Sequence, residues 1–204
     1  MAGGRNTDLV ATTLLVDRSL ILPDHIWELF DMRNRLVAEV SRQLGPRLST
    51  VITYSEVARA SSLEEAAADG PDPVYGSNLQ HALLMARCAA RTTGGDHILL
   101  LTYSLPSAHH TDGTQPFFME PPIAESLEAA RREAVSAISD GLHIDILTVV
   151  PDGDEARSAT INAFFIPMAE AAGGRIDSVA TGQEIESVAG TITRTRRRHP
   201  PSAP

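Results

Sequence analysis

The stretch YGSNLQHALLMARCAARTTGGDHILLLTYSLPSAH, residues 75–109, decides the fold. Its first part, residues 78–91, has the spacing of apolar residues that is typical of a helix with one buried side. It is followed by HILLLT, residues 97–102, a short run that is apolar at successive positions and predicts a strand covered on both faces. A helix that leads into such a strand predicts an α/β fold with a parallel sheet.

The same alternation continues on both sides of this stretch. Apolar runs predict further strands at residues 9–16, 49–54, 143–150 and 175–179, and helical spacing predicts helices at residues 24–44, 123–139, 155–172 and 183–189. A tight turn at Ser55 precedes residues 56–60, where we expect a short antiparallel strand. We therefore predict an α/β fold with a doubly wound, mostly parallel central sheet, one antiparallel edge strand and helices on both faces.

The chain of 204 residues predicts one domain with two tails. We expect a flexible N-terminus at residues 1–8, the folded domain at residues 9–192 and an Arg- and Pro-rich tail at residues 193–204. Residues 61–75 and 109–122 are predicted loops. The second of these loops follows the carboxyl end of a strand, which is the edge where doubly wound sheets bind ligands, so it is a candidate binding loop.

All 17 basic side chains of the sequence are Arg, and none is Lys. Without Lys the chain has neither the lysine of a P-loop nor a lysine for a Schiff base, which excludes P-loop nucleotide hydrolysis and pyridoxal chemistry. The formal charge is −9, and an acidic surface repels the phosphates of nucleic acids, so we expect no nucleic-acid partner.

Cys88 is the single cysteine, which excludes an internal disulfide and a zinc cluster built on cysteines. The first eight residues lack the apolar segment of a signal peptide, and no run of about 18 apolar residues predicts a membrane span. We expect a cytoplasmic protein that has no membrane partner.

Polar residues follow two of the predicted strands and stand at the start of one predicted helix. They are Asp17 and Ser19 after the first strand, Ser77 and Asn78 before the helix at residues 78–91, and Tyr103 and Ser104 after the strand at residues 97–102. Because the carboxyl ends of parallel strands share one edge of the sheet, we expect these residues to form a common rim.

With these residues in place, the sequence resembles a von Willebrand factor type A domain, of the bacterial cytoplasmic kind that accompanies magnesium-chelatase-like and MoxR-type AAA+ ATPases. Residues 75–109 are similar to that group's Y-G-T-N-x-x-H-A-L-x-L-A-R helix start and I-x-x-I-T-D-G-E-P-T-A-H strand and loop. Gly141-Leu142-His143-Ile144-Asp145 is similar to its G-I-x-I-N turn. The resemblance covers about residues 9–198 and implies the same α/β fold and a protein partner.

The resemblance also implies a metal-ion-dependent adhesion site, which binds Mg²⁺ or Mn²⁺ through D-x-S-x-S, a Thr and an Asp from three loops. Asp17 and Ser19 match the first pattern, but Ile21 stands at its second Ser. Ser77 replaces the Thr and keeps a hydroxyl, whereas Tyr103 replaces the Asp. Since Mg²⁺ gives up its water reluctantly, one carboxylate with two hydroxyls is a weak ligand set.

We therefore predict a degenerate site without a metal or other cofactor. The alternative is a reduced Mg²⁺ site that uses Asp17, Ser19 and Ser77. Arg18 is expected to place a positive charge beside Asp17, and Tyr103 to fill the vacated metal position as a plug. The three polar residues also have purely structural readings as caps of turns, and the sequence leaves both readings open.

The loop at residues 109–122 is the candidate docking surface. His109 begins it, and Phe117, Phe118 and Met119 could anchor a partner through their apolar side chains. Alternatively these three side chains fold the loop back over the sheet. Adjacent His109 and His110 lack the spacing that places metal ligands on one face, so we expect His109 to hydrogen-bond the backbone.

Together these observations predict a noncatalytic protein-interaction module of von Willebrand A type, with a MoxR-type or chelatase-like AAA+ ATPase as the partner that the resemblance implies. A third interpretation is a small hydrolase. Ser104 follows a strand, but its surroundings lack the G-x-S-x-G pattern of a nucleophile turn. A hydrolase would require a Ser, a His and an acid within hydrogen-bond reach of one another.

Overall fold

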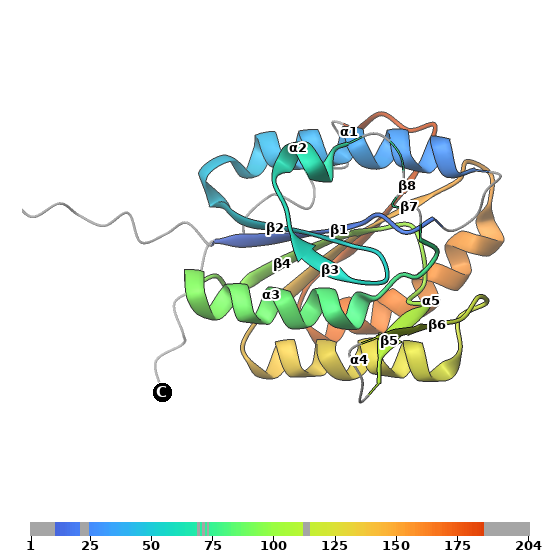
Figure 1. Cartoon of the computed structure of the whole chain (residues 1–204). Helices are drawn as coiled ribbons and strands as arrows, with labels where there is room; N and C mark the ends of the chain where they lie inside the picture. Colours follow the sequence, from blue (N-terminus) through green and yellow to red (C-terminus); the bar gives the residue numbers. More distant parts are fainter. Residues whose placement is uncertain are drawn as a thin grey trace, which may run out of the picture.

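The computed structural model describes residues 11–20, 25–68, 70, 72, 74–111 and 115–185. A six-stranded sheet with the order β3-β2-β1-β4-β7-β8 forms its centre (Figure 1). The strands are β1 (Thr12–Asp17), β2 (Leu48–Tyr54), β3 (Ala58–Ala60), β4 (His97–Thr102), β7 (His143–Val150) and β8 (Ile176–Ala180). All neighbours pair in parallel except β3, which is antiparallel to β2. The predicted α/β fold with one antiparallel edge strand is confirmed.

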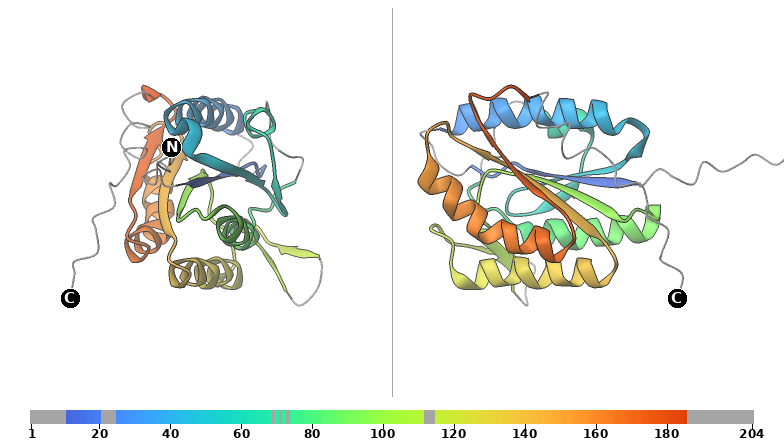
Figure 2. Two further views of the ribbon diagram at one scale, coloured as in Figure 1. Left: turned by 90° about the vertical axis from the view of Figure 1, so that its left-hand side faces the viewer. Right: turned by 180° about the vertical axis from the view of Figure 1, so that it is seen from behind.

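Helices cover both faces of the sheet, as the two views of Figure 2 show. Helix α1 (Ile26–Leu44) lies on one face, and α3 (Leu79–Thr93), α4 (Ala124–Ser139) and α5 (Glu155–Ala171) lie on the other. Successive side chains of a strand point to opposite faces. In β1, Leu14 and Val16 accordingly join the cluster around α1, whereas Leu15 joins the cluster around the other three helices. This two-sided burial is why the central strands are apolar at successive positions.

The ends of α3 follow from its sequence. The side chain of Asn78 caps the helix by accepting a hydrogen bond from the backbone N–H of His81, at 3.0 Å. At the other end Gly94 has φ of 72°, a left-handed conformation that favours glycine and stops the helix. The helix therefore starts at the position where the rim loop ends, which fixes Ser77 and Asn78 relative to the sheet.

Two predicted loops contain regular structure. Helix α2 (Leu63–Ala66) lies in the predicted loop at residues 61–75, where Ser62 and Glu65 form a capping box. The predicted binding loop at residues 109–122 contains a hairpin of β5 (Ala108–His110) and β6 (Pro116–Phe118). Strands of three residues are too short to show a period of two, so the loop prediction was wrong there.

Some predictions lie outside the described residues. These are the tails at residues 1–8 and 193–204, Ile21, and the part of the predicted helix at residues 183–189 that follows residue 185. Among the helices that the structure describes, none combines the length and apolarity needed to cross a membrane.

Candidate functional site

The predicted rim forms at the carboxyl ends of β1 and β4, which are neighbours at the centre of the sheet. Asp17 is the last residue of β1, and Ser104 follows the end of β4 by two residues. Ser77 reaches the same place from the loop before α3. The structure thus brings together three polar residues that the sequence predicted, from segments separated by 60 and 87 positions.

The carboxylate of Asp17 is the centre of this rim and is fully buried. Its Oδ1 accepts hydrogen bonds from the backbone N–H and the hydroxyl of Ser19, at 3.0 and 2.7 Å. Its Oδ2 accepts from three further hydroxyls: Ser77 at 3.2 Å, Thr102 at 2.8 Å and Ser104 at 2.7 Å. Sequence analysis missed Thr102 as a partner. Both oxygens of the carboxylate are therefore supplied with donors from the protein itself.

Burial and hydrogen bonding act on Asp17 in opposite directions. Burial disfavours the charged carboxylate and raises its pKa, and the hydrogen bonds from Ser104, Ser19 and Thr102 act to lower it. Burial has the larger effect, so the pKa of Asp17 lies above its ordinary value. The hydroxyls hold the carboxylate in place without abolishing the cost of its burial.

Tyr103 joins the first loop of the rim to the core under α1. Its hydroxyl donates to the backbone carbonyl of Ser19, and its ring packs on Phe30 of α1, with ring centroids 5.5 Å apart. The ring belongs to the apolar cluster on the α1 face and is fully buried. Burial raises the pKa of Tyr103 well above its ordinary value, which keeps the phenol neutral as a donor. The side chain that replaces the family's acid is therefore part of the core.

Two arginines surround the first loop, and the prediction for one of them was wrong. Arg18 does not pair with Asp17; its guanidinium turns to Asp72, at 3.2 Å, and to three backbone carbonyls. Arg33 of α1, which the sequence analysis missed, is fully buried and donates to the carbonyls of Asp17 and Ala68, at 3.3 and 3.2 Å. Its burial lowers the pKa of Arg33 to about 10.

Asn78 has a structural part in the rim. Besides capping α3, its amide donates to the carbonyl of Glu56 at 2.9 Å and contacts the ring of His110 at 3.0 Å. The backbone N–H of Ser77 beside it donates to the hydroxyl of Ser107, also at 3.0 Å. These contacts lock the loop before α3 against the loop after β4.

The hairpin divides the predicted docking residues between inward and outward positions. His109 contacts the hydroxyl of Ser126 at 2.9 Å, a side chain and not the backbone as predicted. Phe118 is half-buried and stacks on the ring of Tyr75, with centroids 6.4 Å apart. Phe117 and Met119 keep 39% and 43% of their surface exposed. Phe118 therefore holds the hairpin to the domain, and its two neighbours are the surface residues.

A hydroxyl, an imidazole and a carboxylate do converge, but at the opposite end of the sheet. The Thr12 hydroxyl contacts His97 Nδ1, and His97 Nε2 contacts Asp145 Oδ2, both at 3.0 Å. Burial acts to raise the pKa of Asp145, but the hydrogen bonds from His97 and from the backbone of Arg175 outweigh it and lower that pKa. Thr12 is 2% exposed and lies within a strand, so its oxygen offers a substrate almost no access.

The donor set around Asp17 does not match what a hard divalent cation requires. Such a cation takes several oxygen ligands, with carboxylates to balance its charge. Asp17 brings one carboxylate, and the side chains that contact it are the hydroxyls of Ser19, Ser77, Thr102 and Ser104. Within the described part of the chain, no group of three or more His, Cys, Asp or Glu side chains is placed to hold a metal.

Comparison with solved structures agrees with this fold. Similar structures are SpaC, a pilus adhesin from Lactobacillus rhamnosus GG in an open conformation, with a TM-score of 0.65 and 13% identity; the human COPII-coat protein Sec24c, with 0.57 and 15%; and the manganese-loaded TRAP protein from Plasmodium vivax, with 0.52 and 13%. The matches cover 93%, 92% and 87% of this chain and 30%, 32% and 71% of those chains. This chain thus spans about a third of the adhesin and of the coat protein.

No curated protein matches the sequence. Residues 11–188, by contrast, match the family described as "Rv0959-like protein, vWA domain". That match covers all the strands, the helices and the three loops of the rim. The chain therefore belongs to the von Willebrand factor type A domain family of Rv0959-like proteins.

Proposed function

We propose that the chain is a noncatalytic protein-interaction module whose rim works without a metal ion. Membership of the von Willebrand A family supports an interaction role. The proposal that no metal binds at the rim rests on the carboxylate of Asp17, which already accepts five hydrogen bonds from the protein. A cation would have to compete with these donors and would find one carboxylate to balance its charge.

Calorimetry with Mg²⁺ and with Mn²⁺ tests the metal-free rim. We expect no heat of binding and no change in the thermal midpoint when either ion replaces EDTA. The alternative is a reduced Mg²⁺ site on Asp17, Ser19 and Ser77. The TRAP protein, which has a similar fold, is loaded with manganese in its structure. A thermal shift with either metal that disappears in Ser77→Ala would establish this alternative and reject the metal-free rim.

The docking surface that we propose consists of the rim and the exposed side of the β5–β6 hairpin. Phe117 and Met119 would supply its apolar contacts, because exposed apolar side chains contribute most when a partner removes them from water. The partner that we propose is a MoxR-type or chelatase-like AAA+ ATPase. With no Lys, this chain would leave nucleotide binding to the ATPase.

The partner proposal is tested with the AAA+ ATPase encoded nearest to this protein's gene, purified and titrated in the presence of nucleotide. We expect saturable binding that weakens at least tenfold in Phe117→Ser/Met119→Ser. The control is Val135→Ser, an exposed apolar residue on α4. Binding that is equally strong in both variants would exclude the hairpin, and no binding would exclude this ATPase.

We also propose a cytoplasmic location, supported by a sequence with one cysteine and therefore no disulfide of its own. One specific feature favours the hydrolase interpretation: the side chains of Thr12, His97 and Asp145 contact one another in series. We assign it a structural role, because Thr12 is buried and its strand pairs directly with that of His97. An esterase activity that is lost in Thr12→Val would reverse this assignment.

A further inference from the structure

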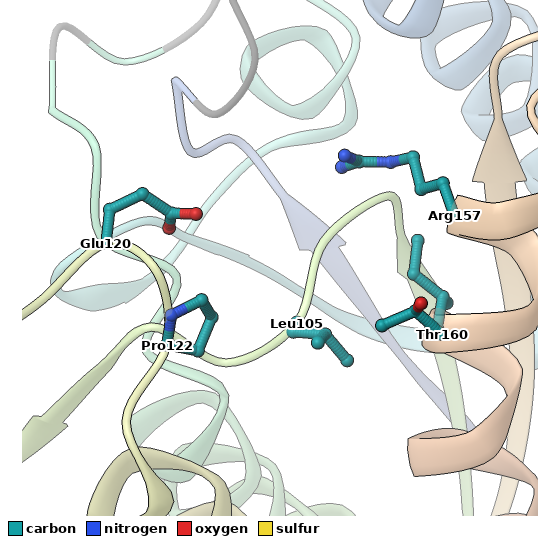
Figure 3. Close-up of a pocket in the computed structure, with 6 residues that line it drawn as sticks. Leu105, Glu120, Pro122, Arg157 and Thr160 are labelled. Atoms are coloured by element: carbon teal, nitrogen blue, oxygen red, sulfur yellow. The ribbon is translucent and has the colours of Figure 1, made fainter.

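A pocket of about 250 Å³ lies beside the rim and has no part in the function proposed above. Three segments line it: the loop after β4, the segment before α4 and the first turns of α5 (Figure 3). Its lining residues are Leu105, Glu120, Pro122, Arg157, Thr160 and Ile161. The pocket therefore combines one carboxylate, one guanidinium, one hydroxyl and three apolar side chains.

The two charged side chains face each other across this pocket. In Figure 3 the carboxylate of Glu120 and the guanidinium of Arg157 point toward one another from opposite sides. No ion pair of 4.0 Å or less joins them, although both belong to the part of the chain that is described. The gap between them offers an acceptor at one end and donors at the other.

Arg157 is held in this position by the protein. Its guanidinium donates to the carbonyl of Tyr103 at 2.8 Å, and its backbone N–H donates to Asp154 at 3.0 Å. Its Nε is buried and has no hydrogen-bond partner among the described residues. Burial lowers the pKa of Arg157, which means that its charge is only partly compensated. An anionic group in the pocket would supply that compensation.

Glu120 supplies the negative charge on the other side of the pocket. Burial raises the pKa of Glu120, and Arg157 opposes this effect from across the pocket. Glu120 is an exposed residue at the pocket, and no ion pair of 4.0 Å or less joins its carboxylate to a cationic side chain that the structure describes. A cationic group of a ligand beside Glu120 would stabilise its charged form.

The volume of the pocket limits the class of ligand. An engineered protein cavity of about 150 Å³ holds one benzene molecule, and pockets for drug-sized ligands measure about 300–1,000 Å³. At about 250 Å³ this pocket suits a molecule the size of an amino acid and is too small for a nucleotide.

Charge limits the class further. A simple anion would meet Glu120 and the net charge of −9 on the chain, and a simple cation would meet Arg157. A molecule with both charges and no net charge satisfies both side chains at once. We propose that this pocket binds a small zwitterion, a free amino acid with an apolar side chain. Its carboxylate contacts Arg157, its ammonium contacts Glu120, and its side chain packs on Leu105, Pro122 and Ile161.

The test is a thermal-shift and calorimetric screen of the twenty free amino acids on the full chain. For each amino acid that binds, the N-acetyl derivative removes the ammonium and the amide derivative removes the carboxylate. We expect at least one apolar amino acid to bind, and both of its derivatives to bind at least tenfold more weakly. A screen in which no amino acid binds would overturn the proposal, as would equal binding of either derivative.

Matched variants locate the site. Arg157→Gln and Glu120→Gln should each weaken binding at least tenfold, whereas Arg132→Gln and Glu128→Gln, on the exposed side of α4, should leave it unchanged. Thermal midpoints without ligand establish that each variant is folded. Unchanged binding in both pocket variants would place the ligand elsewhere and reject the assignment. Metal titrations and ATPase binding are separate measurements, so the proposed function can fail while this proposal holds.

Discussion

The phenolic hydroxyl of Tyr103 donates a hydrogen bond to the backbone carbonyl of Ser19. This contact joins the loop after β4 to the loop after β1, across the two central strands of the sheet. The resemblance in sequence aligns Tyr103 with an acid of the metal site of von Willebrand A domains. Here the same position closes the rim from the α1 side, with a ring that packs on Phe30.

The first prediction concerns this contact. Tyr103→Phe keeps the ring and removes the donor, leaving the buried carbonyl of Ser19 without it. We expect the free energy of unfolding to fall by about 1–3 kcal/mol, the cost of an unsatisfied buried polar group. Urea denaturation measures it. Tyr75→Phe, on a ring that is 55% exposed, is the control and should change stability by less than about 0.5 kcal/mol.

The second prediction concerns Arg33, whose guanidinium lies over the ring of Phe30, 4.0 Å from its centroid. Arg33→Met keeps most of the volume but removes the donors to the carbonyls of Asp17 and Ala68. We expect a loss of about 1–3 kcal/mol in the free energy of unfolding. The matched change Arg35→Met, two residues along α1 and half exposed, should have almost no effect. Equal stability of the two variants would contradict a supporting role of Arg33 under the rim.

The third prediction concerns Gly174, which lies between α5 and β8. A Cβ atom at this position would lie 1.9 Å from the carbonyl oxygen of Ile144 in β7, so backbone would have to move. We expect Gly174→Ala to destabilise the protein by about 3 kcal/mol or more. Gly182→Ala is the control, because its Cβ would lie at an ordinary 3.4 Å from Asp152. Thermal unfolding of the two variants and the wild type measures this difference in stability.

The fourth prediction concerns pH. Burial raises the pKa of Asp17 in the folded state, so the folded protein retains this proton to higher pH than the unfolded chain. The stability that this group contributes is complete below its unfolded pKa of about 3.9 and is lost as the pH rises through its folded pKa. We expect this decline in the wild type and not in Asp17→Asn. Asp31→Asn, on the exposed side of α1, is the control.

Urea denaturation at a series of pH values above 4 gives the two curves. Their difference isolates Asp17, because the other titrating groups are common to both proteins. Parallel curves for the wild type and Asp17→Asn would show that burial has not raised the pKa of this carboxyl.

Much of the fold could be predicted from the sequence, since the central strands are apolar on both faces and end abruptly at polar residues. Asp17, Ser77 and Ser104 could be assigned to one rim because parallel strands end at the same edge. The direction of individual side chains could not be predicted. Thr102 stands one residue before the position that the family uses, and its hydroxyl reaches Asp17 only because β4 lies next to β1.

Arg33 had a signal in the sequence that was not used. Leu29, Phe30, Leu36 and Val37 form the buried stripe of α1, and Arg33 falls within that stripe by its spacing of three and four. A charged residue on an apolar stripe is buried only when it has partners. The pocket between Glu120 and Arg157 could not be predicted from the sequence. These two residues are 37 positions apart, and only the tertiary structure brings them together.

The buried polar contacts also bear on how the sheet responds to force. At one end of the central pair, the carboxylate of Asp17 accepts from Thr102; at the other end, the hydroxyl of Thr12 contacts His97. Each contact joins residues 85 positions apart, and together they tie both ends of β1 to both ends of β4. Sliding these two strands past each other would require breaking both side-chain contacts along with the backbone hydrogen bonds between them. Shear of β1 against β4 is therefore resisted by a side-chain contact at each end of the pair as well as by the backbone hydrogen bonds between them.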